Sequence, residues 1–332
     1  MTDPGFFKRL TFFSHFTEPE LGTLASCVVA DRHPAESVIL EQGESSQDAY
    51  ILHEGSVHIE RDTPYGRFVL AKLGEGEMFG ETSFVDGGPR SGTVRAAESA
   101  EVFRLSPLAL SSAGETNPRF EIAMYWSFWK SLSRKLRNTN ERLAEFFTRT
   151  GEVPDSKPFL EPGESGEFRI DLASKRKLFL EQKLSSMEIN FLTSLSREEK
   201  LKDGQIVFRE GDVGDKMYVV LDGRVMISKS IPGAGEEALA FLERGDYFGE
   251  MALIDNKPRS ADAKAHQGDA VVLAIPRDVL EGILDIDKVT SKRMLTILCS
   301  LIAKRLRALD EKIVGWFILS GGGIGGEEET KA

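Results

Sequence analysis

The feature that most constrains the fold is that the sequence repeats itself. Gly43 and Gly55 in the first half match Gly211 and Gly223 in the second half at an offset of 168 residues. Each half contains short runs in which apolar and polar residues alternate, separated by turn residues. Short strands with regularly spaced turns are typical of a β-sandwich or jelly roll. At 332 residues the chain is long enough for two such domains. The sequence therefore predicts a mainly β protein with flanking helices, built from two jelly-roll β-barrels in tandem.

A shorter motif occurs once in each half. It reads FGETSFVDGGPRSGT over Phe79–Thr93 and FGEMALIDNKPRSAD over Phe248–Asp262. In both copies a glutamate follows Phe-Gly, and an arginine comes nine residues after the glutamate. The glycine permits a tight turn with close backbone approach, and the next residues suit one helical turn whose first amides favour an anion. Because a guanidinium matches a phosphate and a carboxylate accepts hydrogen bonds from sugar hydroxyls, the motif indicates a cradle for a ribose phosphate.

The two motifs resemble the phosphate-binding cassette of cyclic nucleotide-binding domains, F-G-E-x-A-L followed by P-R-[AS]-A. Such domains form the regulatory modules of cAMP-dependent protein kinase and the sensor of bacterial catabolite activator proteins. The resemblance implies that the two glutamates hold the ribose 2′-hydroxyl and that the two arginines hold the cyclic phosphate, with backbone amides nearby assisting. The implied ligand-binding residues are Gly80, Glu81, Ser83, Arg90 and Ser91 at the first site, and Gly249, Glu250, Ala252, Arg259 and Ser260 at the second.

The second copy is the closer match to this cassette. In the first copy Thr82 and Ser83 follow the glutamate, and Gly92 stands where alanine is usual. Members of the family that prefer cGMP resemble one another in having threonine after the cassette arginine, where this chain has Ser91 and Ser260. The resemblance therefore favours cAMP as the ligand, with cGMP as the other candidate, and it implies no further cofactor.

Each predicted barrel is followed by a helical stretch with one apolar stripe, over residues 119–147 and 289–318. The stripes contain Ile122, Tyr125, Trp129, Leu132, Leu136, Leu143 and Phe146 in the first stretch, and Leu295, Cys299, Ile302, Leu306, Leu309, Ile313 and Trp316 in the second. Steps of three and four residues indicate amphipathic helices. Either these helices cover their own barrels, or they dimerise or move when ligand binds. In the resembling family a residue of the helix after the barrel caps the purine base, and the candidates by residue type are Trp126, Trp129, Trp316 and Phe317.

Residues 6–30 read as short helices that precede the first barrel. Thr17 is the expected N-cap of one of them, with Glu20 in the capping-box position. The aromatic residues of this stretch are expected to pack on the domain that follows, the alternative being an amphipathic membrane anchor. These residues are Phe12, Phe13 and Phe16.

The expected organisation is a first domain with its helix over residues 6–150 and a second over residues 175–320. Residues 151–174 are predicted to be a linker, since Pro, Gly and acidic residues dominate its first part. Residues 321–332 consist of a glycine run and an acidic cluster and are predicted to be a disordered tail.

Composition excludes several classes of partner. The formal net charge of −11 disfavours nucleic acid, whose binding depends on Lys and Arg neutralising phosphates. No run of eighteen apolar residues is present, so no membrane-spanning helix is expected, and the N-terminus lacks the pattern of a signal peptide. Cys27 and Cys299 lie far apart in apolar stretches, and we interpret both as reduced core residues of an intracellular, cytoplasmic protein.

The sequence contains no pattern typical of metal binding or catalysis. His53 and His58 are five residues apart, which would place them on opposite faces of one strand, and the other three histidines are scattered. No nucleophile elbow, Walker loop, kinase signature or zinc-protease helix is found. We therefore expect neither a metal site nor enzymatic activity.

Together these features predict a cytoplasmic receptor for a cyclic nucleotide. Ligand in the two cassettes would reposition the helices at 119–147 and 289–318 and so change their contacts with a partner protein or a second copy of the chain. Neither a DNA-reading domain nor the Arg-Arg inhibitor segment of kinase regulatory subunits is expected from the sequence. The alternative is a scaffold that keeps the cyclic nucleotide-binding fold for protein–protein interaction and binds no nucleotide.

Overall fold

The computed structural model describes residues 2–150, 195–231, 235–286 and 291–319. The chain divides into two compact units, Met1–Lys135 together with Ile286–Ala332, and Leu136–Asp285. The linker expected at 151–174, the start of the second expected domain, and the tail expected at 321–332 lie outside the described residues.

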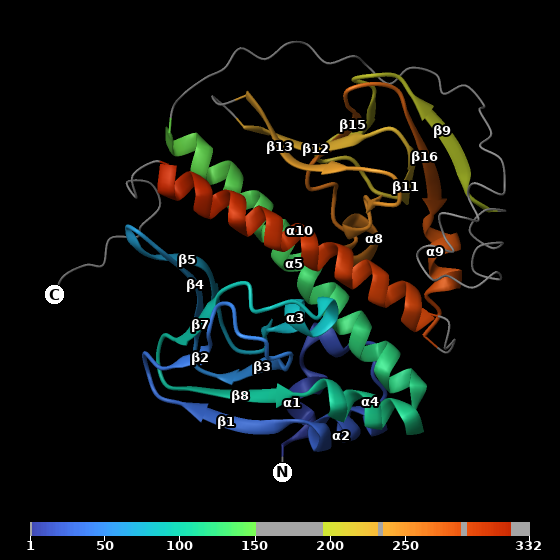
Figure 1. Ribbon diagram of the computed structural model, residues 1–332. Helices are drawn as coiled ribbons and strands as arrows, with labels where there is room; N and C mark the ends of the chain where they lie inside the picture. Colours follow the sequence, from blue (N-terminus) through green and yellow to red (C-terminus); the bar gives the residue numbers. More distant parts are fainter. Residues whose placement is uncertain (1, 151–194, 232–234, 287–290, 320–332) are drawn as a thin grey trace. The chain divides into compact units, whose positions relative to one another are not determined.

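The first unit contains two four-stranded antiparallel sheets (Figure 1). Their strand orders are β1-β8-β3-β6 and β2-β7-β4-β5. The strands are β1 Val29–His33, β2 Val38–Leu40, β3 Ala49–Glu54, β4 Val57–Thr63, β5 Gly66–Leu73, β6 Met78–Phe79, β7 Thr93–Ala96 and β8 Ala100–Leu105. This is the predicted jelly-roll arrangement, but the strands form two facing sheets and not one closed barrel.

The core of the first unit lies between these sheets. Strand side chains alternate between the two faces, so each sheet contributes every second residue to the interior. The contributors are Leu40, Val57, Leu73, Val94 and Ala96 from one sheet, and Tyr50, Leu52, Phe79, Ala100 and Val102 from the other. Burial of each large apolar side chain stabilises the fold by about 1.5–3 kcal/mol. Apolar residues therefore occupy the inward-facing positions, and this produces the alternation seen in the sequence.

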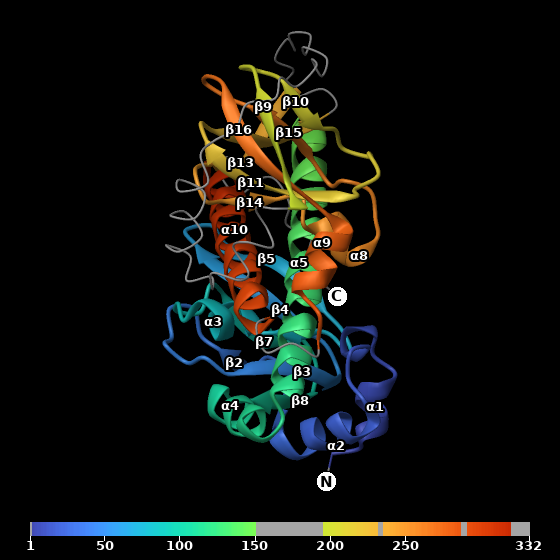
Figure 2. The same cartoon turned by 90° about the vertical axis from the view of Figure 1, so that its right-hand side faces the viewer.

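The second unit repeats this topology strand for strand. Figure 2 labels most of its strands, among them β9, β10, β15 and β16. Its sheets have the orders β14-β11-β16-β9 and β10-β15-β12-β13. The strands are β9 Arg197–Leu201, β10 Ile206–Phe208, β11 Lys216–Asp222, β12 Val225–Ile231, β13 Gly235–Leu242, β14 Tyr247–Phe248, β15 Asp262–Ala265 and β16 Ala270–Pro276. The predicted turns at Gly55 and Gly223 are confirmed, with φ of 85° and 75°. A Cβ at either position would lie 2.4 Å from the carbonyl oxygen of Ser99 or Asp269, so only glycine fits.

Short helices precede the sheets of the first unit, as predicted. They are α1 Pro4–Lys8, η1 Thr11–Phe13 and α2 Glu18–Cys27. The capping box is present, because Glu20 Oε2 accepts a hydrogen bond from the Thr17 backbone N–H at 2.8 Å. Phe12 and Phe13 are buried, and Phe16 packs edge-on against Phe120. These aromatic side chains therefore belong to the protein core, and the membrane-anchor alternative is wrong.

Two long helices complete the described chain. A short helix, α4 Pro107–Thr116, is followed by α5 Pro118–Thr150, and α9 Arg277–Ile283 is followed by α10 Ser291–Leu319. In the first unit α10 contacts α3 Glu81–Asp86 and strand β4 (Figure 1). The alternative in which each helix covers its own barrel therefore does not hold for α10, which follows the second half of the repeat but packs on the first. Periodicity shows that a helix has an apolar face, but it does not identify the surface that this face meets.

The predicted apolar stripe of α10 is confirmed as a buried surface. Its buried members are Leu295, Cys299, Ile302, Leu306, Leu309 and Ile313, whereas Trp316 is half-buried and the next residue, Phe317, packs on Phe68. Because these side chains are buried within a single chain, this stripe is not an exposed surface for a second copy.

Candidate functional site

The first cassette begins at a glycine in the left-handed region. Gly80 has φ 77°, α3 starts directly after it, and Gly87, with φ 68°, caps its C-terminal end. A Cβ on Gly80 would lie 2.8 Å from both Arg90 Nη1 and the Asp48 carbonyl oxygen. The glycine is thus required both by its backbone conformation and by the approach of the arginine. The tight turn predicted at this glycine is present, and the group that approaches its backbone here is the protein's own guanidinium.

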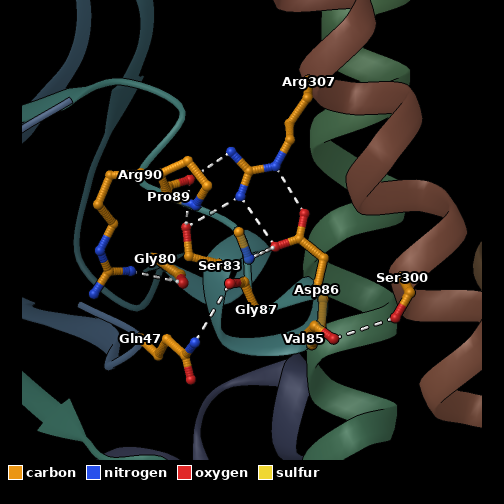
Figure 3. A network of polar contacts seen from close by, with 11 residues as sticks. Gln47, Gly80, Ser83, Val85, Asp86, Gly87, Pro89, Arg90, Ser300 and Arg307 are labelled. Carbon is orange, nitrogen blue, oxygen red and sulfur yellow. Dashed lines mark hydrogen bonds and ion pairs between the residues drawn. The ribbon is translucent and has the colours of Figure 1, made fainter. Parts of the chain in front are cut away.

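The arginine of this cassette, Arg90, is buried, with 3% of its surface exposed. Its Nη1 donates to the Gly80 carbonyl at 3.0 Å (Figure 3), its Nη2 to the Asp48 carbonyl at 2.8 Å, and its Nε to Ser46 Oγ at 2.9 Å. All three acceptors are neutral. Burial lowers the pKa of Arg90, because it penalises the charged form. An anion placed beside this guanidinium would offset that penalty.

Glu81 is the first residue of α3 and is fully buried. Its Oε1 accepts hydrogen bonds from Ser131 Oγ at 2.8 Å and from Lys135 Nζ at 2.6 Å, both on α5. Its Oε2 is buried and has no hydrogen-bond partner within the described part of the chain. A buried carboxylate oxygen without a donor is costly, so Oε2 is available for a ligand hydroxyl. Sequence reasoning missed Ser131 and Lys135, whose i, i+4 spacing places them on one helix face.

The second cassette has the same construction. Gly249 has φ 76°, and α8 Met251–Asp255 follows Glu250, which is 2% exposed. Arg259 is 5% exposed and donates to the carbonyl oxygens of Gly249 and Lys216, the latter at 2.7 Å. Burial again lowers the pKa of this guanidinium.

The arginines of the two cassettes differ in their surroundings. Ser46, which receives the Nε hydrogen of Arg90, corresponds in the repeat to Gly214. Instead, the Arg259 guanidinium lies over the ring of Phe208, with Cζ 4.2 Å from the ring centroid. A cation over an aromatic face is stabilised by the ring quadrupole. Each arginine also lies about 6 Å from a tyrosine ring, Tyr50 or Tyr218, so the two sites differ in the hydroxyl at the first and the closer phenylalanine at the second.

The remaining cassette residues lie beside these pairs. Ser83 is buried on α3 and its Oγ donates to the Pro89 carbonyl at 3.2 Å (Figure 3). Ala252 is buried on α8, and Ser91 and Ser260, each directly after the cassette arginine, are half-buried. The structure therefore gathers both sets of sequence-predicted residues into two equivalent cradles, each formed by a two-residue strand, one helical turn and the loop after it.

The aromatic candidates for capping a base make other contacts. Trp126 stacks on His15, with ring centroids 4.6 Å apart, and Trp129 is buried in the first unit. Lys312 Nζ lies over the ring of Trp316, and Phe317 packs on Phe68. None of these contacts involves a cassette residue, so the base-capping assignment stays a prediction.

One feature of both cassettes was not anticipated from the sequence. The carboxylate at the end of each cassette helix, Asp86 or Asp255, is bonded by an arginine, Arg307 in the first unit and Arg137 in the second. Figure 3 shows the Arg307 guanidinium between Asp86 and the Pro89 carbonyl. No sequence signal marks these arginines, since each lies far along the chain from the cassette it contacts.

His53 and His58 were predicted to lie on opposite faces of one strand, and this prediction is wrong. His53 is in β3 and His58 in β4, on either side of a turn, and His53 packs against Phe6 and Phe103. Across the residues that the structure describes, no group of three metal-ligating side chains is found. Among those same residues, no helix combines the length and apolar character needed to cross a bilayer.

Comparison with known proteins gives the class. The family model described as cyclic nucleotide-binding domain matches residues 31–117 and 198–287. The two matches span more than half of the chain, and each contains one cassette. The chain belongs to the cyclic nucleotide-binding domain family and carries two such domains.

Several curated proteins are similar to it. The cGMP-dependent protein kinase of Eimeria tenella is 26% identical over 271 residues, which is 82% of this chain and 22% of the kinase. The cAMP-dependent protein kinase regulatory subunit of Dictyostelium discoideum is 24% identical over 253 residues, 75% of this chain and 63% of the subunit. The cyclic AMP receptor protein of Thermus thermophilus is 32% identical over 127 residues, 38% of this chain and 56% of that protein. The chain thus spans less than two thirds of the length of each relative.

Solved structures are similar as well. The regulatory domain of Toxoplasma gondii PKA, crystallised with cAMP, is 21% identical with a TM-score of 0.31, covering 88% of this chain and 92% of that domain. A cyclic nucleotide-binding domain from Methylobacillus flagellatus is 24% identical with a TM-score of 0.39, covering 42% of this chain and 82% of that one.

Proposed function

We propose that this protein is a non-catalytic receptor that binds a cyclic nucleotide in each of its two cassettes. The residues that bind it are Gly80, Glu81, Ser83, Arg90 and Ser91 at the first site, and Gly249, Glu250, Ala252, Arg259 and Ser260 at the second. In this assignment the arginines bind the cyclic phosphate and the glutamates accept hydrogen bonds from the ribose.

The observation that carries the proposal is the pair of buried guanidinium groups with neutral partners. Arg90 and Arg259 are 3% and 5% exposed, and their described hydrogen-bond acceptors are carbonyl and hydroxyl oxygens. A buried charge is costly unless an opposite charge compensates it. Since each guanidinium lies beside a cassette helix and a buried glutamate, a ligand with one negative phosphate and a sugar hydroxyl satisfies both groups together.

For the identity of the nucleotide we propose cAMP in preference to cGMP. The support is the serine after each cassette arginine, Ser91 and Ser260. The names of the relatives include both nucleotides, so this preference rests on the two serines and on the family resemblance.

We further propose that the nucleotide controls contacts with a partner protein, in the cytoplasm. Both cysteines are free thiols, and free thiols are typical of a reducing compartment. Cys299 is buried as predicted, whereas Cys27 is half-buried and not a core residue. Since the α10 stripe is buried within the chain, such a partner would bind another surface or a rearranged state of the helices.

The test is calorimetric titration of cAMP, and then of cGMP, into the wild-type protein, Arg90→Ala and Arg259→Ala. A hydrogen bond to a charged group contributes about 1.5–3 kcal/mol, so each variant should lose roughly tenfold or more in affinity at its own site. Arg32→Ala is the matched control, because Arg32 is 83% exposed and pairs with Glu101 outside the cassettes. Two sites in the wild type with one weakened in each cassette variant would support the proposal. Absence of binding by the wild-type protein would favour the scaffold alternative.

A further inference from the structure

The same three-point contact holds the cassette in each unit. In the first unit Arg307 Nε and Nη2 donate to the two Asp86 carboxylate oxygens at 2.7 and 3.0 Å, and Nη1 donates to the Pro89 carbonyl at 2.7 Å. In the second unit Arg137 makes these bonds to Asp255 at 2.8 and 3.1 Å and to Pro258 at 2.9 Å. Two parallel N–H···O bonds to one carboxylate are the strongest geometry available to arginine.

The two contacts are equivalent positions of the internal repeat. Asp86 and Asp255 are 169 residues apart, as are Pro89 and Pro258 and the cassette arginines themselves. In both units the aspartate carboxylate also accepts a hydrogen bond from the backbone N–H two residues later, at 2.8 Å and 3.0 Å. The matching geometry in two separate units indicates a feature of the cassette and not an incidental surface ion pair.

Each of these two arginines lies on the long helix that follows the other half of the repeat. Arg307 lies on α10, which follows the second half of the repeat, yet it holds the cassette of the first unit. Arg137 lies on α5, which follows the first half, yet it holds the cassette of the second unit. Each cassette is therefore bonded to the helix that the other half of the repeat supplies.

The contact acts on the segment that would bind phosphate. In the first unit Pro89 directly precedes Arg90, and Arg307 Nη2 is also 3.2 Å from Ser83 Oγ, so the guanidinium bridges α3 and the loop that carries Arg90 (Figure 3). The Asp86 side chain is 8% exposed and that of Arg307 is 19% exposed, so solvent screens this pair weakly. Two turns before Arg307 on α10, Ser300 Oγ donates to the Val85 carbonyl at 3.2 Å and strengthens the same attachment.

We infer that Arg307 and Arg137 are positioning residues of the two nucleotide sites, each supplied by the helix of the other half. They hold the loop before the cassette arginine in the geometry that receives phosphate, so nucleotide binding at one cassette and docking of the opposite helix reinforce each other. This inference rests on the proposed function. By linkage, the factor by which the docked helix raises nucleotide affinity equals the factor by which nucleotide strengthens docking.

The test measures each site alone. Calorimetric titration of cAMP into an Arg259→Ala background reports the first site, and Arg307→Met is expected to weaken it roughly five- to fiftyfold. In an Arg90→Ala background, which reports the second site, Arg307→Met should leave the affinity unchanged. Arg137→Met is expected to give the reciprocal result. Lys304→Ala is the control, because Lys304 is an exposed cation one turn before Arg307 on α10.

A second readout separates positioning from a purely structural role. Cys299 lies on α10, is fully buried and has its thiol pKa raised by burial. In a Cys27→Ser background, saturating cAMP should slow alkylation of Cys299 in the otherwise wild-type protein and in Lys304→Ala, but not in Arg307→Met. Asp86→Asn, which removes the carboxylate charge without changing the side-chain size, should behave as Arg307→Met does and replaces it if that variant does not fold.

The outcomes separate the two proposals. No binding of cAMP or cGMP by the wild-type protein would overturn the proposed function. Two working sites, with first-site affinity and Cys299 protection unchanged in both Arg307→Met and Asp86→Asn, would overturn the positioning role while the receptor function stands. Weakening of both sites to the same extent by Arg307→Met would also overturn it, because the role assigned to Arg307 is specific to the first cassette.

Discussion

Lys135 Nζ lies 2.6 Å from Glu81 Oε1, and the carboxylate it contacts is fully buried. The helix after the first pair of sheets therefore supplies the positive charge that compensates the proposed ribose-binding glutamate. The other oxygen, Oε2, has no partner within the described chain. One oxygen is thus held by α5, and the other is the one that the proposed function assigns to a ribose hydroxyl.

Removal of this lysine should destabilise the first unit. In Lys135→Met the Glu81 carboxylate stays buried without its cation, and breaking a buried pair on one side typically costs about 3–5 kcal/mol. Thermal unfolding and urea denaturation measure the loss. Adding Glu81→Gln to Lys135→Met should recover most of the stability, since no charge is then left uncompensated. Lys8→Met is the control, because Lys8 is 63% exposed in its pair with Glu18. Equal stabilities for Lys8→Met and Lys135→Met would contradict this account.

Gly80→Ala should affect both folding and nucleotide binding. A left-handed backbone costs a residue with a Cβ roughly 1–2 kcal/mol, and this Cβ would also lie 2.8 Å from Arg90 Nη1. Gly43→Ala is a matched control, because Gly43 has φ 84° but nothing within 4 Å of its added Cβ. Both variants should lose similar stability from backbone strain, whereas only Gly80→Ala should displace Arg90 and weaken the first site in calorimetric titration. Equal nucleotide affinities would show that Arg90 is not displaced.

The second site should be sensitive to a single methyl group at Gly214. A Cβ there would lie 2.4 Å from Ala252 Cβ and 2.9 Å from Arg259 Cζ, so Gly214→Ala must move either α8 or the cassette arginine. We expect at least tenfold weaker binding at the second site, roughly the effect of losing one charge-assisted hydrogen bond. First-site affinity in the same Gly214→Ala variant is the control and should not change, because Ser46, at the equivalent position of the first site, already carries a Cβ. Unchanged second-site affinity in Gly214→Ala would mean that the cassette adjusts without cost.

Acidification should destabilise the first unit through His15. Burial, assisted by Lys130 and Arg119, lowers the pKa of His15 from its ordinary value of 6.5 to about 4. Between these values the unfolded chain binds more protons than the folded one, so stability is lost as the pH falls from 6.5 towards 4. Urea midpoints at pH 7, 5 and 4 measure this loss. His15→Gln removes the titrating group and should show a smaller decrease over this window, and an identical decrease would exclude His15 as a cause.

Much of the site was predictable because its chemistry is local in sequence. Gly80, Glu81 and Arg90 lie within one short motif, and a turn glycine, a helix start and a guanidinium each act over a few residues. The alternation in the strands was equally readable, since a strand places every second side chain in the core. Ser131, Lys135, Arg137 and Arg307 were missed, because they reach the cassettes from helices far along the chain.

By itself, the sequence determined that the chain contains two copies of a jelly-roll unit, each with a paired glutamate and arginine after a tight glycine turn. Local periodicity, turn chemistry and motif spacing are sufficient for these conclusions. Only the tertiary structure decided which surface the apolar face of α10 covers, and that an arginine from each long helix bonds the cassette of the other half of the repeat. An amphipathic pattern indicates which face of a helix is apolar and must be buried, but many surfaces of a protein could cover that face. The choice among them depends on shape and on charges such as Asp86 that come together only in the folded chain.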